Sequence, residues 1–112
     1  MKRRFPWALV AMLFLAPTAY PASWSPDLRF QIEGISQSEA LIFISGLAYG
    51  LSYTAARLAH DGKRNFYCLP SGKTVDSKLL VELLNQRLVG SQAAERVTSV
   101  TVVGLAENFP CK

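Results

Sequence analysis

The residues best suited to chemistry in this sequence are two cysteines, Cys68 and Cys111, and a single histidine, His60. The cysteines do not form a Cys-x-x-Cys pair, and one histidine leaves too few ligands for a tetrahedral zinc site. His60 has no serine, cysteine or carboxylate at a recognisable catalytic spacing, and a histidine at a helix end is favourable beside the negative end of the helix dipole. The sequence therefore predicts no catalytic residues, no metal and no cofactor. We expect a binding protein rather than an enzyme.

The first 22 residues have the organisation of a secretory signal peptide. Three cations in MKRRF precede the apolar run WALVAMLFLA, and PTAYPAS follows with prolines and small residues. The run has ten apolar residues, but a helix that crosses a bilayer needs about 20. We predict cleavage after Ala22, with Ala19 as the alternative, and one exported domain comprising residues 23–112 that is no longer attached to the membrane.

Loss of the signal peptide changes the charge of the chain. Without Lys2, Arg3 and Arg4, nine of the twelve cations remain against eight anions, and the formal net charge falls from +4 to +1. The remaining cations are scattered, so no nucleic-acid partner is expected. About 90 residues remain, which is near the size at which a hydrophobic core alone is only marginally stable.

The two cysteines offer additional stabilisation. In a small exported chain two cysteines most often form a disulfide with each other, and the alternatives are a lone reactive thiol or a pair of metal ligands. A Cys68–Cys111 bridge would stabilise the fold by about 4 kcal/mol in the chain-entropy model.

A long helix is predicted to begin at Ser36, which has Glu39 at the spacing of a capping box. The 17 residues 40–56 carry no charge, so a membrane span is an alternative, but their hydroxyls are more easily satisfied in a protein core. Gly46 and Gly50 have the small-xxx-small spacing that lets helices approach closely. We expect this helix to be the buried centre of the domain, with both glycines packed against a neighbouring helix.

Two further helices are predicted in the C-terminal half. Thr74 is the expected N-cap of a helix over residues 74–89, in which five leucines form one stripe: Leu79, Leu80, Leu83, Leu84 and Leu88. Residues 97–103 favour a strand by their β-branched composition, but four residues at helical spacing favour a helix over 91–108: Ala93, Val97, Val100 and Gly104.

With a short helix after Pro26, these elements predict an all-α fold, a small bundle of about four helices. Its C-terminal part would be a helical hairpin joined by a tight turn. Cys68 precedes the first helix of the hairpin and Cys111 follows the second, so their bridge would close its open end and prevent fraying of the last helix.

The segments FISGLAYGL, FYCLPSGKTVDSKLLVELL and GLAENFPC together resemble the Rap/Tai family of immunity proteins, over residues 42–111. Family members are small helical periplasmic proteins associated with type VI secretion amidase effectors. This chain lacks two further cysteines that many members carry, and it has Gly72, Lys73 and Thr74 where the family has Gly-Val-Thr. The resemblance implies a periplasmic protein that binds and inhibits a peptidoglycan-cleaving amidase through a protruding loop, and a homodimer in some members.

A second function remains open at this stage, a small periplasmic stress or folding-assistance protein with a detachable helical interface. Such a protein would be expected to carry many titrating carboxylates, and this chain has eight against nine cations after export.

Two polar turns are candidates for contact with a protein partner. The first is HDGKRN and the aromatic residues that follow, where Gly62 is expected to end the long helix in a left-handed conformation. The second is the turn at residues 90–92. The arginine and aromatic content of the first turn favours it, because both are enriched at interface centres. The predicted contact residues are Asp61, Lys63, Arg64, Asn65 and Tyr67.

Overall fold

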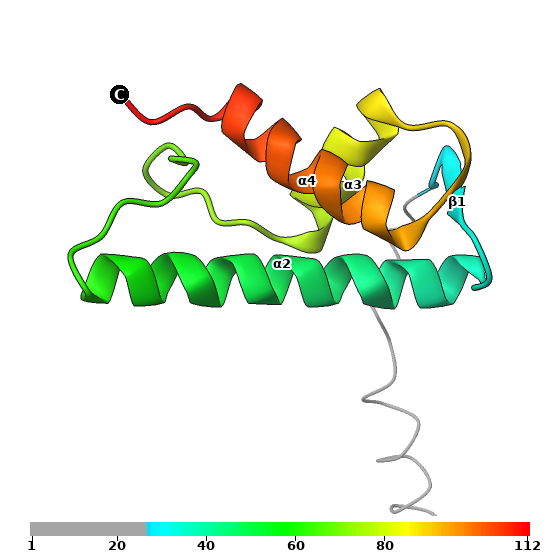
Figure 1. Cartoon of the computed structure of the whole chain (residues 1–112), viewed down its shortest axis with the longest axis horizontal. Coiled ribbons are helices and arrows are strands. Elements are labelled where there is room, and N and C mark those ends of the chain that lie inside the picture. The colour runs from blue at the N-terminus through cyan, green and yellow to red at the C-terminus, as the bar shows by residue number, and fades with distance from the viewer. Residues whose placement is uncertain (1–26) are drawn as a thin grey trace, which may run out of the picture.

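The computed structural model describes residues 27–112, so the expected signal peptide and its cleavage site lie outside it. The elements in chain order are β1 (Phe30–Ile32), α2 (Gln37–His60), α3 (Ser77–Arg87), β2 (Gly90–Gln92) and α4 (Ala94–Asn108) (Figure 1). The described part is mostly helical, as expected. It has three helices and one short pair of parallel strands, so the expected count of about four helices is not confirmed in residues 27–112.

The segment after Pro26 is a strand where a short helix was expected. Phe30 and Ile32 are buried and Gln31 between them is exposed, which is the two-residue alternation of a strand. β1 pairs in parallel with β2, a segment nearly sixty residues later in the chain, with Phe30 opposite Gly90. The pairing partner decides the structure here, because a three-residue strand has no local means of satisfying its backbone.

α2 begins at the predicted capping box. The Glu39 amide donates to the Ser36 hydroxyl at 3.2 Å, and the Ser36 amide donates to Glu39 Oε1 at 3.0 Å. The hydrogen bond that the Glu39 carboxyl accepts from the Ser36 backbone is the main cause that lowers the pKa of this carboxyl below its ordinary value, and the Ser36 side chain contributes to the same shift. The first turn is thus specified by local sequence alone.

α2 is not the buried centre of the domain. Its buried residues are Ala40, Ile44 and Ala48, all on one face. Figure 1 shows α3, α4 and the segment after α2 on the same side of this helix. Gly46 and Gly50 are exposed, and a Cβ placed on either would meet no other atom within 4 Å. The expectation that these two glycines pack against a neighbouring helix is therefore wrong within the described chain.

The close approach between helices occurs instead at Gly104 of α4. A Cβ at this position would lie 2.6 Å from Leu83 Cδ2 of α3. α3 contacts both α2 and α4, and its predicted leucine stripe supplies much of the core, with Leu80, Leu83 and Leu84 buried. Helical periodicity, rather than β propensity, correctly identified α4.

The C-terminal hairpin differs in detail from the prediction. α3 begins later than expected, because Asp76 and not Thr74 is its N-cap, and Asp76 Oδ1 accepts a hydrogen bond from the Leu79 amide at 2.8 Å. The connection to α4 is not a tight turn, because residues 90–92 form β2.

The disulfide between Cys68 and Cys111 is present, with the two Cα atoms 5.0 Å apart. It joins the segment ahead of α3 to the residues after α4. The Cys68 amide also donates to the Phe109 carbonyl at 2.8 Å, directly at the end of α4. The bridge thus fixes the C-terminal end of the last helix, as predicted, and it indicates an oxidising compartment outside the cytoplasm.

Candidate protein-binding site

The predicted contact loop begins where α2 ends, and its backbone is closely held. Gly62 has a φ of 68°, the left-handed conformation predicted for it. Its amide donates to the Ala59 carbonyl at 3.1 Å and the Lys63 amide donates to the Leu58 carbonyl at 2.8 Å. These two hydrogen bonds form a Schellman motif, which sets the direction in which the chain leaves the helix. The loop therefore leaves α2 along a defined path.

Asp61 lies at the helix end and faces back along α2. Its Oδ2 is 3.3 Å from Nε of Arg57, one turn earlier, and both side chains are largely exposed. An exposed ion pair of this kind contributes little to stability. Asp61 is occupied by this neighbour and does not line the cavity described below.

Tyr67 anchors the loop to the core. It is 4% exposed, and its hydroxyl donates to the Leu51 carbonyl of α2 at 3.3 Å. The neighbouring Phe66 ring packs edge-on against it, with 4.8 Å between ring centroids, and remains 43% exposed. Tyr67 was expected among the contact residues, but of this aromatic pair it is Phe66 that can offer a ring to a partner.

An open cavity of ≈ 480 Å³ lies between this loop, the last turns of α2 and residues 111–112. Its volume is within the range of small-molecule pockets, about 300 to 1,000 Å³. The disulfide forms part of its wall through Cys68 and Cys111. Ser52 and Val75 also line it, and the Ser52 hydroxyl donates to the Val75 carbonyl at 2.8 Å, which ties the far end of the loop to α2. The walls of this open cavity are thus formed by segments that covalent and hydrogen bonds hold together.

Four cationic side chains line this cavity, and none of its lining side chains is acidic. They come from three separate segments: Lys63 and Arg64, Lys73, and the C-terminal Lys112. These are four of the nine cations that residues 27–112 contain, so charge that is scattered in the sequence is concentrated here. This excess of positive charge favours an anionic group, such as a carboxylate side chain on a partner.

Four of the five predicted contact residues therefore line one cavity: Lys63, Arg64, Asn65 and Tyr67. Sequence reasoning missed Lys73 and Lys112, whereas Phe66 belongs to the aromatic pair that favoured this turn and does not line the cavity. Lys112 is adjacent to the bridged Cys111, so the disulfide prediction already placed it near Cys68. No local signal pointed to Lys73, which reaches the cavity because the 70–73 turn folds back, with the Lys73 amide donating to the Pro70 carbonyl at 3.1 Å.

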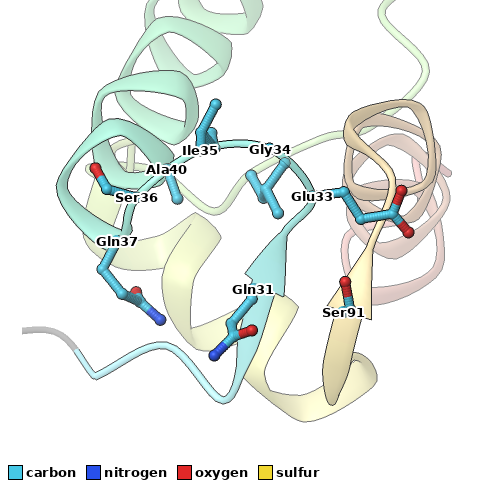
Figure 2. Close-up of a pocket in the computed structure, with 9 residues that line it drawn as sticks. Gln31, Glu33, Gly34, Ile35, Ser36, Gln37, Ala40 and Ser91 are labelled. Atoms are coloured by element: carbon cyan, nitrogen blue, oxygen red, sulfur yellow. The ribbon is translucent and has the colours of Figure 1, made fainter.

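The second candidate turn, residues 90–92, is strand β2 and not a protruding loop. The Gly90 amide donates to the Arg29 carbonyl at 3.3 Å, and the Glu33 amide donates to the Gln92 carbonyl at 2.9 Å. A smaller cavity of ≈ 380 Å³ lies beside it. Figure 2 shows that its walls come from β1, the turn that follows, the first turn of α2 and Ser91 of β2.

The two cavities are far apart on the molecule. The smaller one reaches Ala40 in the first turn of α2, and the larger one reaches Ala59 in the last. At 1.5 Å per residue these two positions are about 28 Å apart along the helix axis. A partner segment that enters one cavity does not reach the other without a large interface.

Comparison of the chain with models of protein families, with curated proteins and with solved structures finds no match.

Proposed function

We propose that this chain is a periplasmic immunity protein that binds a peptidoglycan-cleaving amidase effector of a type VI secretion system and blocks its activity. The proposal rests on the resemblance of residues 42–111 to the Rap/Tai family and on one structural observation. That observation is the cationic cavity at the C-terminal end of α2, whose wall contains the disulfide.

The physical argument starts from the entropy of binding. A loop that must become ordered on binding loses affinity, so an inhibitor gains when its contact surface is held in place beforehand. In this chain the Schellman motif, the buried Tyr67 ring and the Cys68–Cys111 bridge each restrain the loop independently. Restraint of this degree is typical of inhibitors that present a rigid surface to an enzyme.

The chemistry of the surface supports a protein partner. Arg64 is exposed and offers five donors in a planar group, and Phe66 beside it offers an exposed aromatic ring. Arginine and aromatic side chains dominate the binding energy of protein interfaces. The residues of the amidase that bind here would include a carboxylate, which can pair with Arg64 while the surrounding lysines supply a favourable potential.

The proposal is tested with the amidase encoded beside this chain's gene, which is where a cognate effector is expected. The mature chain should bind and inhibit this enzyme. Arg64→Ala should weaken binding by about 2 kcal/mol, which is roughly 30-fold in Kd. Arg96→Ala is the matched control, because Arg96 is an exposed cation on α4 that does not line the cavity. Both variants should have the thermal unfolding midpoint of the unmodified protein.

Three results would count against the proposal. The absence of binding or inhibition would contradict the immunity function itself. Equal loss of binding in Arg64→Ala and Arg96→Ala would indicate a non-specific charge effect. Loss of binding only on substitution of residues 90–92 would place the interface at the opposite end of α2.

A further inference from the structure

A third open cavity adjoins the cationic one. It has a volume of ≈ 270 Å³ and is lined by residues of α2 and of the segment that leads into α3. Ser52 and Val75 line both cavities, so the two hollows lie next to each other along α2. The chain that leaves α2 turns back and runs alongside this helix before α3 begins (Figure 1). The two cavities together are called the α2 groove here.

The α2 groove has the length of a short extended peptide. Its wall on α2 runs from Ser45 to Ala59, a separation of 14 residues. At 1.5 Å per residue this distance is about 21 Å along the helix axis, which an extended chain covers with about six residues. The dimensions therefore suit a strand-like segment better than a single small molecule.

Hydrogen bonds hold the two walls of the groove together. The Ser52 hydroxyl donates to the Val75 carbonyl at 2.8 Å, and the hydroxyls of Ser45 and Ser77 are hydrogen-bonded at 2.9 Å. The groove is thus formed before a ligand arrives, which reduces the entropy that is lost on binding.

The wall opposite α2 offers backbone donors. Val75 is buried between its exposed neighbours Thr74 and Asp76, and Asp76 has an extended backbone with a φ of −127° and a ψ of 174°. The amides of these three residues have no hydrogen-bond acceptor within residues 27–112. The carbonyls of an extended peptide can accept these hydrogen bonds, as they do when a peptide adds to an exposed strand.

The charge of the groove differs between its two ends. The four cations described above lie at one end, whereas the charged side chain of the adjoining cavity is the carboxylate of Asp76. Tyr49 also lines this second end, and 79% of its surface is exposed. The groove is therefore complementary to a segment that has carboxylates at one end and an apolar side chain at the other.

We propose that the α2 groove binds an extended peptide segment of the partner protein, about six residues long, with acidic residues clustered at one end. The carboxylates of this segment pair with Arg64 and Lys73, its backbone pairs with residues 74–76, and an apolar side chain packs on Tyr49. The inference rests on the proposed function in one respect, namely that the partner is the amidase. The chemistry of the segment follows from the groove alone.

A lipid bilayer is the competing occupant. α2 is long and apolar enough to cross a membrane by length and composition, and cations near apolar walls also attract anionic lipids. Insertion of α2 is disfavoured because the hydrogen bonds of Ser45 and Ser52 to the neighbouring segment would have to break. An acyl chain in the groove would also leave the amides of residues 74–76 without acceptors. A peptide satisfies these donors, and a lipid chain does not.

The experiment measures, by fluorescence anisotropy, the binding of the oxidised mature chain to synthetic dodecapeptides that together cover the amidase encoded beside its gene. At least one acidic peptide is expected to bind. The same peptide with Asn and Gln in place of Asp and Glu should bind at least about 10-fold more weakly. Lys73→Glu should weaken binding at least about 10-fold. Lys78→Glu is the matched control, because Lys78 is an exposed cation that does not line the groove.

A pair of tyrosine substitutions tests the other end of the groove. Tyr49 and Tyr53 are both exposed on α2, at 79% and 74%, but Tyr49 lines the groove and Tyr53 does not. Tyr49→Ala should weaken peptide binding at least about five-fold, and Tyr53→Ala should leave it unchanged. All four variants should have the thermal unfolding midpoint of the unmodified protein, because the substituted side chains are exposed.

The outcomes separate the groove from the proposed function. Inhibition of the intact amidase without binding of any of its peptides at about 1 mM would overturn the groove as a peptide site and leave the immunity function standing. Acidic peptides that bind while the intact amidase does not would support the groove and contradict the immunity function. Absence of both kinds of binding would overturn both.

Two further results would overturn the peptide site. One is peptide binding that Lys73→Glu weakens no more than Lys78→Glu does, or that Tyr49→Ala weakens no more than Tyr53→Ala does. The other is co-sedimentation of the mature chain with phosphatidylcholine–phosphatidylglycerol vesicles that Lys73→Glu abolishes and that an excess of the acidic peptides does not prevent. This result would assign the groove to lipid.

Discussion

Removal of the Cys68–Cys111 bridge is the perturbation whose effect can be worked out most fully. The bridge closes a loop of 43 residues that contains α3, β2 and α4. In the chain-entropy model a loop of this length reduces the entropy of the unfolded chain by about 13 cal/mol/K, which corresponds to about 4 kcal/mol at 25 °C. Small domains have total stabilities of about 5 to 15 kcal/mol, so the loss would be a large fraction of the whole.

The assay is urea denaturation of the mature protein followed by circular dichroism. The doubly substituted variant, Cys68→Ser with Cys111→Ser, should be less stable by about 2 to 5 kcal/mol. The unmodified protein treated with a reducing agent is the matched control and should lose the same amount. Hydrogen exchange should show the earliest loss of protection at the Phe109 end of α4, because the Cys68 amide bonds to the Phe109 carbonyl there. A stability change below about 1 kcal/mol would refute the entropic argument, and two free thiols in the exported protein would show that the bridge does not form.

Three other substitutions test separate parts of the fold. Gly104→Ala places a Cβ 2.6 Å from Leu83 Cδ2. It should lower the free energy of unfolding by about 1 to 2 kcal/mol, despite the better helix propensity of alanine. An unchanged midpoint in thermal denaturation would contradict the close packing. Asn85→Ala removes two hydrogen bonds, of 2.8 and 2.7 Å, to the backbone that leads into β1. The change should lower the free energy of unfolding by about 2 kcal/mol and expose the β1 amides to hydrogen exchange. Full protection of these amides in the variant would refute the role of Asn85. The pKa of Glu39 is lowered in the folded state, so the stabilising effect of its carboxylate is complete above the ordinary value of 4.5 and is lost as the pH falls through the lower folded-state value. The stability of the unmodified protein should therefore fall more steeply in acid than that of Glu39→Gln. Parallel curves of stability against pH for the two proteins would contradict this.

Features set by neighbouring residues were readable from the sequence. The capping box at Ser36, the left-handed Gly62 at the end of α2 and the leucine stripe of α3 depend on spacings of three or four residues, and the structure confirms each. The disulfide was also predictable, because a short chain with a signal-like leader contains only two cysteines. The polar loop after α2 was identified as a contact surface from its residue types, but this role remains a prediction.

Features that depend on distant residues required the tertiary structure. Phe30–Ile32 forms a strand only because Gly90–Gln92 lies beside it, and no local pattern links two segments so far apart. The sequence could identify glycines that permit close helix packing, but not which of them has a helix next to it. Gly104 has one, and Gly46 does not.

In the candidate site, too, residues that are close in sequence were found, and residues that only the tertiary fold brings close were missed. Lys63 and Arg64 were identified because they share one turn, but Lys73 and Lys112 join them only through the fold of the loop and the disulfide. Sequence by itself determined the three helices of the described residues and the covalent link between its two cysteines, because both follow from composition and short-range spacing. Which face of α2 is covered, and where four scattered cations meet, was decided only by the tertiary structure, because long-range packing has no fixed spacing along the chain.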